Sequence, residues 1–409
     1  MATIFENCTI FDGRSEELLE GGSILIEDGI IREVSDRPIA AAIGGDRIDL
    51  GGRTLMPGLI DAHFHCYGIE PNPARIDAIA PGLRALHARR IMEGALQRGF
   101  TTVRDAAGGD HVLAAALAGG LIDGPRLLYP GLAISQTGGH GDPRGPDHAP
   151  LCACAYCGAL SVVADGPEEM RKIVREQFRQ GAHHIKLFVS GGVLSPGDPI
   201  WMNQLNDAEI AVAVEEAKTR RSYVMAHAHT NEAALRCVEL GVRSIEHATM
   251  IEDDGVAAIV RNNGFAVPTL AIIDALRTLG PGLGLAAPMV DKVREVADQA
   301  YLALDRLVQG GARIGFGTDL LGGLMDRQTR EFRLRREVCK PIDILRSATS
   351  VNADLIQMTG KLGVIAPGAL ADLLVLNGNP LDDVTLFERP DAIPVIMKDG
   401  RFCRNALAG

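Results

Sequence analysis

The histidines in Asp61-Ala62-His63-Phe64-His65 stand two residues apart, so a strand would direct both imidazoles to one face and Ala62 and Phe64 to the other. Two converging imidazoles form a metal-binding arrangement, although a pair of ordinary hydrogen-bonded histidines gives the same pattern. The spacing alone therefore leaves both interpretations open.

Lys186 raises a separate question, because it stands in the apolar run from His184 to Val189. Ile185, Leu187 and Val189 would face the surrounding helices, which directs Lys186 inward, where a charged ammonium is costly. Two explanations stay open. Either an acidic partner neutralises Lys186 in an internal salt bridge, or its deprotonated amine reacts with carbon dioxide to give a carbamate that bridges two metal ions.

Three further polar residues, His227, His247 and Asp319, each end a strand-like run. Gly315 and Gly317 share the face of Asp319 and are expected to leave open volume beneath its carboxylate for a metal-bound water and a substrate. A solitary histidine or aspartate at a strand end is usually just hydrogen-bonded. Six nitrogen and oxygen ligands at five strand ends instead favour a metal centre.

Strand-like and helical segments alternate through the middle of the chain and would position these residues. The predicted strands are Gly58–His65, Thr101–Asp105, Arg126–Ala133, His184–Val189, Ser222–His227, Ser244–His247, Ala266–Leu270 and Arg313–Asp319. The predicted helices include Pro167–Gln180, Asp207–Arg221 with Asp207 as N-cap, Asn231–Leu240 and Ala286–Gln309. Eight such repeats within residues 58–363 predict an α/β fold, a (β/α)₈ TIM barrel whose active site lies at the carboxyl ends of its strands.

Short alternating runs at both ends of the chain predict a second, smaller domain. They are Thr3–Phe11, Ser23–Ile26, Ile30–Val34, Ala371–Leu376 and Pro394–Met397. We expect residues 1–57 and 364–409 to pair into one discontinuous β-sandwich domain, with the barrel inserted between them.

Composition restricts the class of protein further. The chain has 409 residues, of which 46% are hydrophobic and 23% charged, with a formal charge of -11, so a packed protein without nucleic-acid partners is expected. No apolar run reaches the length needed to span a bilayer, and no signal peptide is evident, so we expect no membrane partner, a cytoplasmic location and reduced cysteines. Cys152, Cys154 and Cys157 have metal-like spacing with only His148 nearby, which favours ordinary thiols in a lid-like loop over residues 137–165.

As a set, these motifs resemble the amidohydrolase superfamily over nearly the whole chain. The resemblance is carried by Pro57-Gly58-Leu59-Ile60-Asp61-Ala62-His63-Phe64-His65, Lys186, His227, His247, Gly317-Thr318-Asp319 and Gly363-Val364-Ile365-Ala366-Pro367-Gly368-Ala369-Leu370-Ala371-Asp372-Leu373. Within it, the chain is similar to the branch of imidazolonepropionase-like proteins and zinc-dependent Xaa-Pro and Xaa-Arg dipeptidases. That similarity is carried by Thr101-Thr102-Val103-Arg104-Asp105, Gly138-Gly139-His140-Gly141 and Ile185-Lys186-Leu187.

The resemblance implies a binuclear centre of two divalent metal ions, with Zn²⁺ expected. The implied ligands are His63, His65 and Asp319 for the more buried ion, His227 and His247 for the more exposed one, and a carbamate on Lys186 that bridges the two. We hypothesise that Asp319 takes the proton of the bridging hydroxide as it attacks an amide carbonyl, then delivers it to the leaving nitrogen.

The substrate implied is a small molecule, with Xaa-Pro dipeptides as the best specific choice and a non-peptide amide, carbamate, urea or cyclic amide as the alternative. A non-catalytic scaffold is disfavoured because the full ligand set is present, and a homo-oligomer is expected. His140, in a loop after the third strand, is a candidate for polarising the carbonyl or contacting a substrate carboxylate, or it has no role. His229 is a further candidate catalytic residue. It stands where related dipeptidases have tyrosine, so the substrate preference of those dipeptidases does not carry over directly. Trp201 either lines the pocket or packs in the core or at the rim.

Overall fold

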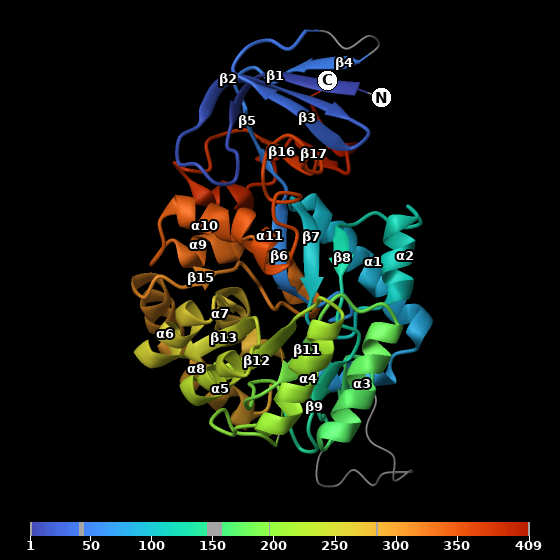
Figure 1. The fold of residues 1–409 in the computed structure, drawn as a ribbon, viewed down its shortest axis with the longest axis vertical. Helices are drawn as coiled ribbons and strands as arrows, with labels where there is room; N and C mark the ends of the chain where they lie inside the picture. Colours follow the sequence, from blue (N-terminus) through green and yellow to red (C-terminus); the bar gives the residue numbers. More distant parts are fainter. Residues whose placement is uncertain (1, 41–44, 145–157, 196, 284, 408–409) are drawn as a thin grey trace.

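The computed structural model describes residues 2–40, 45–144, 158–195, 197–283 and 285–407 as an α/β fold (Figure 1). A β domain lies at the top of this view, above a larger part in which helices and parallel strands alternate. Cys152, Cys154, Cys157 and His148 lie outside the described residues, as does much of the loop predicted over residues 137–165. In the described part of the chain, no helix is long and apolar enough to cross a membrane.

The β domain is one mixed sheet built from both ends of the chain, as the short alternating runs predict. Its strands are β1 (Ala2–Ile10), β2 (Leu19–Glu27), β3 (Ile30–Ser35), β4 (Asp46–Asp49), β5 (Thr54–Pro57), β16 (Leu373–Leu376), β17 (Val395–Lys398) and β18 (Arg401–Asn405). Their order is β18-β17-β16-β5-β1-β2-β3, with β4 paired to β1. Phe5, Ile24, Leu55, Leu373 and Val395 are buried together in its core.

The larger part contains two parallel sheets. One is β6 (Leu59–Phe64), β7 (Phe100–Asp105) and β8 (Arg126–Leu128), and the other has the order β10-β9-β11-β12-β13-β14-β15. The strands of the second sheet are β9 (Ala133–Ser135), β10 (Ser161–Val163), β11 (Ile185–Phe188), β12 (Val224–Thr230), β13 (Ser244–Met250), β14 (Phe265–Val267) and β15 (Arg313–Ile314). Parallel strands joined through helices are the pattern that alternating segments predict for an α/β fold.

Backbone hydrogen bonds connect the two parallel sheets at both ends. The His183 amide donates to the Tyr129 carbonyl at 2.8 Å beside β8 and β11. At the other end, the Ala62 amide donates to the Phe316 carbonyl and the Asp319 amide to the His63 carbonyl, each at 2.8 Å. The segment after β15 is therefore held directly against β6, which brings Asp319 beside the histidine pair.

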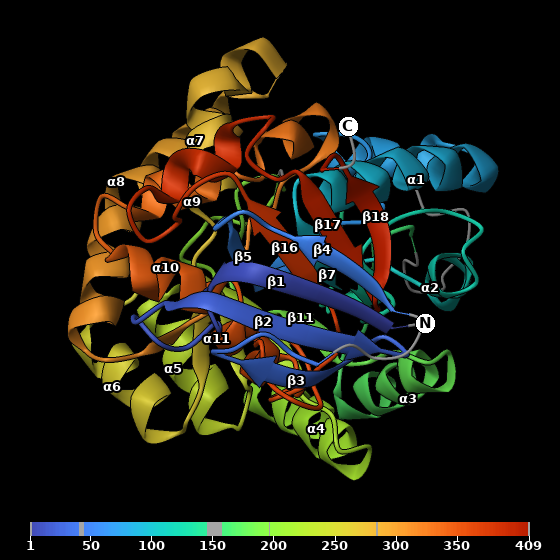
Figure 2. The same ribbon diagram turned by 90° about the horizontal axis from the view of Figure 1, so that it is seen from above.

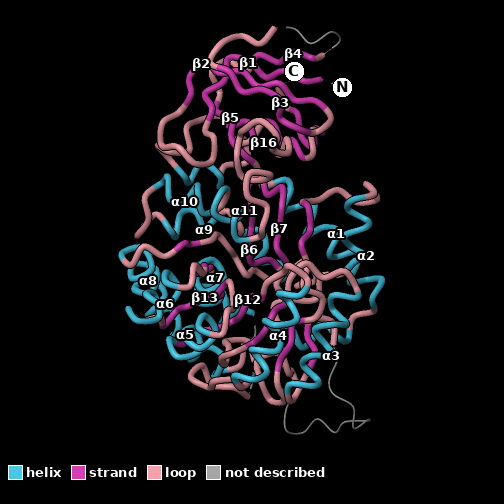
Figure 3. Tube along the Cα trace, viewed as in Figure 1, coloured by secondary structure: helices cyan, strands magenta, loops and turns pink. Residues whose placement is uncertain are grey.

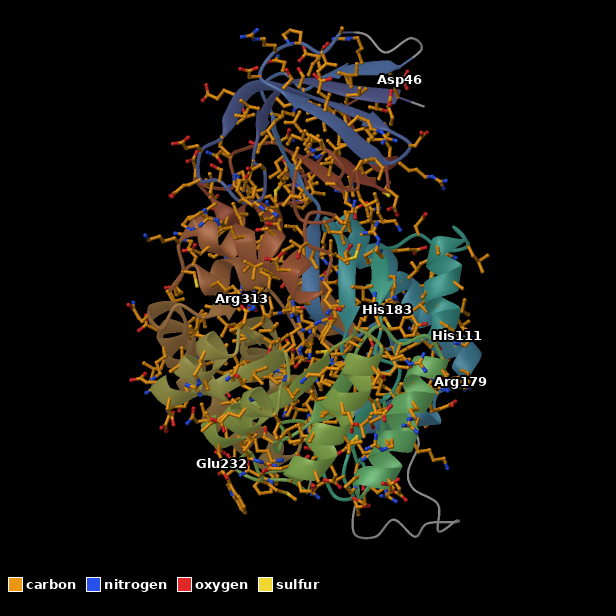
Figure 4. All side chains as sticks on the ribbon, viewed as in Figure 1. Asp46, His111, Arg179, His183, Glu232 and Arg313 are labelled. Atoms are coloured by element: carbon orange, nitrogen blue, oxygen red, sulfur yellow. The ribbon has the colours of Figure 1, made fainter. Side chains whose placement is uncertain are left out.

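Helices surround these strands, as the ribbon seen from above and the Cα tube coloured by secondary structure show (Figures 2 and 3). They are α1 (Pro81–Gln97), α2 (His111–Ala118), α3 (Pro167–Arg179), α4 (Asp207–Thr219), α5 (Asn231–Glu239), α6 (Asp253–Arg261), α7 (Leu270–Leu279), α8 (Ala287–Gln309), α9 (Arg330–Arg335), α10 (Pro341–Ser347) and α11 (Ser350–Leu355). Short 3₁₀ segments cover Pro73–Ala78, Gly280–Leu283, Gly322–Arg327 and Val384–Glu388. Charged side chains such as Arg179 on α3 and Glu232 on α5 point outward from this layer (Figure 4).

Several local predictions differ from the structure, and Leu270, predicted as the end of a strand, instead begins α7. The predicted strand Arg126–Ala133 divides into β8 and β9, because Pro130 has no N–H to donate and Gly131 has a φ of 73°. The predicted strand Arg313–Asp319 is regular only over β15, and its last residue, Asp319, has a left-handed φ of 58°. The N-cap of α4 is Asn206, which forms a capping box with Glu209, instead of Asp207.

Candidate functional site

One cavity of about 340 Å³ collects every residue that the sequence singles out for chemistry. These residues are His63, His65, His140, Lys186, His227, His229, His247 and Asp319. They come from β6, β11, β12 and β13 and from segments that follow β6, β9 and β15. The cavity thus lies where the carboxyl ends of the parallel strands converge, as predicted.

His63, His65 and Asp319 form the tightest group. One carboxylate oxygen of Asp319 lies 2.8 Å from His65 Nε2 and 3.3 Å from His63 Nε2. The three potential ligand atoms all lie within 4.8 Å of one another. Two imidazole nitrogens and a carboxylate oxygen at this separation fit a divalent metal ion.

His227 and His247 lie beside this group, with ring centroids 4.6 Å apart, and the His247 ring is 4.9 Å from that of His63. His227 Nε2 donates to the Gly191 carbonyl at 3.1 Å, so its proton is on Nε2 and the Nδ1 lone pair is available. His247 Nδ1 is 2.7 Å from Thr269 Oγ1. Burial lowers the pKa of both imidazoles well below the usual value, which favours the neutral form that binds metals.

Lys186 is buried and lines the same cavity, so its inward direction agrees with the strand pattern. Its Nζ lies 5.2 Å from the Phe188 ring centroid. Burial lowers the pKa of the amine to about 8, although the charges of Glu246 and Asp319 act in the opposite direction. Those two carboxylates are paired with Arg104 and with the histidines, and Lys186 makes no ion pair among the described residues.

Glu246 and Arg104 complete the buried charge network, and the sequence pattern did not identify either as a site residue. Glu246 lies 2.7 Å from His63 Nδ1 and 2.9 Å from the Arg104 guanidinium, and both charged side chains are fully buried. Burial raises the pKa of Glu246, but the Arg104 charge and the His63 contact outweigh it and lower the value to about 2. The charged carboxylate therefore fixes the His63 ring from the side opposite Asp319.

Asp61 holds the end of β6 against the segment that carries Asp319. Its carboxylate accepts hydrogen bonds from the His63 amide at 3.0 Å, from Thr318 Oγ1 at 2.6 Å and from Gln328 Nε2 at 2.9 Å. A Cβ at Gly317 would lie 2.7 Å from His63 Cβ. The expectation that these glycines leave open volume beneath Asp319 is wrong, because the missing side chain is what allows this close approach.

Gly315 also allows a close approach, in this case of the Asn352 side chain, since a Cβ at Gly315 would lie 2.7 Å from Asn352 Oδ1. The Asn352 amide group in turn donates to the Ile60 and Phe316 carbonyls at 2.7 and 2.8 Å. Asn352 therefore bridges β6 and the segment after β15 through their backbones. Its Oδ1 also accepts from the Phe316 amide at 3.1 Å, at the irregular end of the eighth strand.

His140 and His229 reach the cavity beside the proposed ligands. The His140 ring stacks on His227 with centroids 4.5 Å apart, and its Nδ1 lies 2.7 Å from Ser195 Oγ. His229 stacks on His247 at 4.9 Å, and its Nδ1 lies 2.8 Å from Thr249 Oγ1. Burial lowers the pKa of His140 and brings that of His229 to about 3, so both are neutral hydrogen-bonding groups.

An apolar wall faces the polar side of the cavity. It consists of Ile272, Ile273 and Leu276 on α7 and Met289, Val293 and Val296 on α8. The residues on α8 are spaced by four and three positions, so they form one face of that helix. Trp201 is not among the described residues that line the cavity, and its side chain is 72% exposed. The interpretation that Trp201 lines the pocket is therefore wrong.

A model of the amidohydrolase family matches residues 54–403. The crystal structure of an amidohydrolase, 43% identical in sequence, aligns over all of this chain and all of its own with a TM-score of 0.97. A prolidase complexed with N-methylphosphonate-L-proline is 40% identical and aligns over 99% of this chain and 100% of its own, with a TM-score of 0.96. Ochratoxinase from Aspergillus niger is 32% identical over 373 residues, which cover 87% of this chain and 76% of the relative.

Proposed function

The chain belongs to the amidohydrolase family and is a hydrolase acting on C–N bonds, and we propose that its substrates are small dipeptides of the Xaa-Pro type. The observation that carries the proposal is the single cavity in which a set of metal-ligand side chains faces an apolar wall. The prolidase that is 40% identical was crystallised with a proline derivative, which supports proline as the leaving residue. We further propose that the two parallel sheets, connected at both ends, form a closed (β/α)₈ barrel.

The family generally uses a binuclear metal centre, and the donor set fits one. The proposed ligands are His63, His65 and Asp319 for one ion and His227 and His247 for the other. Lys186 would supply further oxygen ligands as a carbamate, since burial lowers the pKa of its amine to about 8 and so eases the deprotonation that carbamate formation requires. Zn²⁺ suits imidazole and carboxylate ligands, and bound divalent ions polarise a carbonyl and activate water near neutral pH.

Asp319 is the residue placed to move a proton during the reaction. Its carboxylate is held between His63 and His65, is 20% exposed, and lines the cavity in which the amide would lie. The carboxylate would accept the proton of the attacking water and deliver it to the leaving nitrogen, so that the amine departs neutral. The left-handed backbone at Asp319 and its amide bond to the His63 carbonyl fix the position from which it does so.

His140, His229 and the apolar wall would orient the substrate. The two neutral imidazoles offer hydrogen bonds to a carbonyl or a carboxylate, and the aliphatic side chains of α7 and α8 offer contact area for a proline ring or an apolar side chain. Placing the scissile carbonyl on the polar side and the apolar group on the other fixes one productive orientation.

The apolar wall also favours a second candidate, a non-peptide amide with a bulky apolar group. Ochratoxinase, the fungal relative that is 32% identical, supports this alternative. The aliphatic side chains of this wall line a cavity of about 340 Å³ and would offer contacts to a group larger than a proline ring. Xaa-Pro dipeptides and aryl amides are therefore the two substrate classes to compare directly.

Protein loaded with Zn²⁺ is expected to bind about two metal ions per chain and to cleave Xaa-Pro dipeptides, fastest where Xaa is apolar. Metal content is measured by mass spectrometry, and cleavage by chromatography over a panel of Xaa-Pro, Xaa-Arg and Xaa-Gly dipeptides. Chelator treatment should abolish cleavage, and added Zn²⁺ should restore it. Turnover of aryl amides or carbamates without cleavage of any dipeptide would replace the Xaa-Pro proposal with the second candidate.

The variant Gly192→Ala is expected to lower kcat/KM roughly 10- to 100-fold, because it displaces His140. A Cβ at this position would lie 2.1 Å from the Cε1 atom of the His140 ring. Kinetics with the best dipeptide provide the measurement. Gly197→Ala, in the same loop, has no atom within 4 Å of the added Cβ and should retain full activity. Equal activity of the two variants would show that His140 has no part in turnover.

A further inference from the structure

Lys292, on α8, makes three hydrogen bonds that the proposed chemistry does not use. Its Nζ donates to the Gly192 and Ser195 carbonyls at 2.9 Å each and to the Asp198 carbonyl at 2.5 Å. An ammonium has three N–H groups, so these carbonyls use its whole donor capacity. The side chain is only 12% exposed.

The three carbonyls belong to the loop after β11, residues 191–195 and 197–204, which we name the 190s loop. Val193, Leu194 and Ser195 of this loop line the cavity. Lys292 donates to the carbonyl of Gly192, just before Val193, and to the carbonyl of Ser195. It therefore fixes both ends of the segment of the loop that lines the cavity. The same helix supplies Met289, Val293 and Val296 to the apolar wall of the cavity.

The 190s loop in turn holds His140. Ser195 Oγ lies 2.7 Å from His140 Nδ1, and the Gln204 side chain accepts the His140 amide at 2.9 Å. Gly192 lies against the face of the His140 ring, where any side chain would collide with it. A shift of the loop would therefore move His140 together with the cavity wall.

Asp198 shows why a cation is needed at this position. Its side chain is buried, and Oδ2 accepts bonds from the Gly192 amide at 3.0 Å and the Gln204 side chain at 3.2 Å. Oδ1 has no hydrogen-bond partner among the described residues, and the nearest charge is Lys292 Nζ at 3.9 Å. An uncompensated buried carboxylate is costly, so the ammonium stabilises both the charge of Asp198 and the carbonyls around it.

We propose that Lys292 is a positioning residue that clamps the 190s loop to α8, and thereby sets the width of the cavity and the orientation of His140. It acts through the loop and does not touch the reacting atoms. The part of this inference that concerns turnover rests on the proposed amide hydrolysis, whereas the clamp itself is a property of the fold. Arginine cannot replace it well, because a planar guanidinium does not match three carbonyls arranged around one nitrogen.

Trp201 provides a reporter for the clamp, because it is the only tryptophan of the chain and lies in the 190s loop with 72% of its surface exposed. In Lys292→Met, which keeps the aliphatic stem, time-resolved fluorescence anisotropy should show a larger amplitude of nanosecond motion at Trp201. The same variant should lose roughly 10- to 100-fold in kcat/KM at unchanged metal content. Lys172→Met, an exposed lysine on α3, is the matched control and should change neither measurement.

Unchanged Trp201 motion in Lys292→Met overturns the clamp. Increased motion with unchanged kcat/KM per folded enzyme also overturns the positioning role, because Lys292 would then only stabilise the fold. If the wild-type protein hydrolyses no amide, the proposed function fails. In that case increased Trp201 motion still supports the clamp, and unchanged motion still overturns it. The two proposals are thus tested separately.

Discussion

Replacing Asp319 with Asn is expected to lower kcat by about 10²- to 10⁴-fold while part of the metal stays bound. Asparagine keeps the size of the side chain and one oxygen donor but cannot accept and return a proton. The four histidines of the proposed centre are unchanged, so metal binding should be weakened and not abolished. The measurement pairs kcat for the best substrate with metal content determined on the same sample.

Asp326→Asn is the matched control for this change. Asp326 follows Asp319 closely in the chain, but its side chain is 91% exposed, and within the described part of the chain its ion pair is with Arg98, at 3.5 Å. The same chemical change there should leave kcat and metal content unaltered. Wild-type turnover in Asp319→Asn with a full metal complement would contradict the proposed proton transfer and assign the base to another group. Loss of all metal in that variant would show that Asp319 acts mainly as a ligand.

The polar residues of the site were predictable because strand geometry restricts where side chains point. Residues two apart share a face, and the carboxyl ends of parallel strands converge at one end of a barrel-like array. Those two rules place His63 with His65 and bring Lys186 and Asp319 toward them. The structure places all of the predicted residues around one cavity.

Glu246 was missed because it breaks the rule that found the others. It directly precedes His247, so regular alternation would send these two side chains to opposite faces. His247 instead has a left-handed φ of 71°, which interrupts the pleat and lets both side chains reach the interior. A histidine in this backbone region is uncommon, and the sequence carries no local turn signal for it.

Contacts between distant segments were also beyond sequence reasoning. The bond from Lys292 to Gly192 joins residues 100 positions apart, and a lysine in a helix gives no sign that it is bonded to a loop. The apolar stripe of α8 predicts a buried face equally well whether that face packs on a core or lines a cavity. The regular length of the eighth strand was overestimated because Gly315 and Gly317 serve close packing against Asn352 and His63.

Replacing Arg104 with Met is expected to lower the free energy of unfolding by about 3–5 kcal/mol, because it leaves the Glu246 carboxylate buried without its guanidinium partner. Both side chains are fully buried, and Arg104 also donates to the Ala62 carbonyl at 2.5 Å, next to His63. Urea unfolding followed by circular dichroism measures the change. Arg89→Met, which breaks an exposed pair with Glu93 on α1, should leave the unfolding curve in place.

The double variant Arg104→Met with Glu246→Gln separates charge from packing. If the loss in the single variant comes from an unpaired buried carboxylate, neutralising Glu246 should recover a large part of it, even though a second native side chain has been removed. If the lower free energy of unfolding of Arg104→Met comes instead from lost packing around the guanidinium stem, the losses of the two single variants should add in the double variant. The recovered protein should still bind metal poorly, because a neutral amide no longer holds the His63 ring as Glu246 does, at 2.7 Å. Stability restored without metal affinity would therefore show that this buried ion pair is retained for the metal centre and not for the fold.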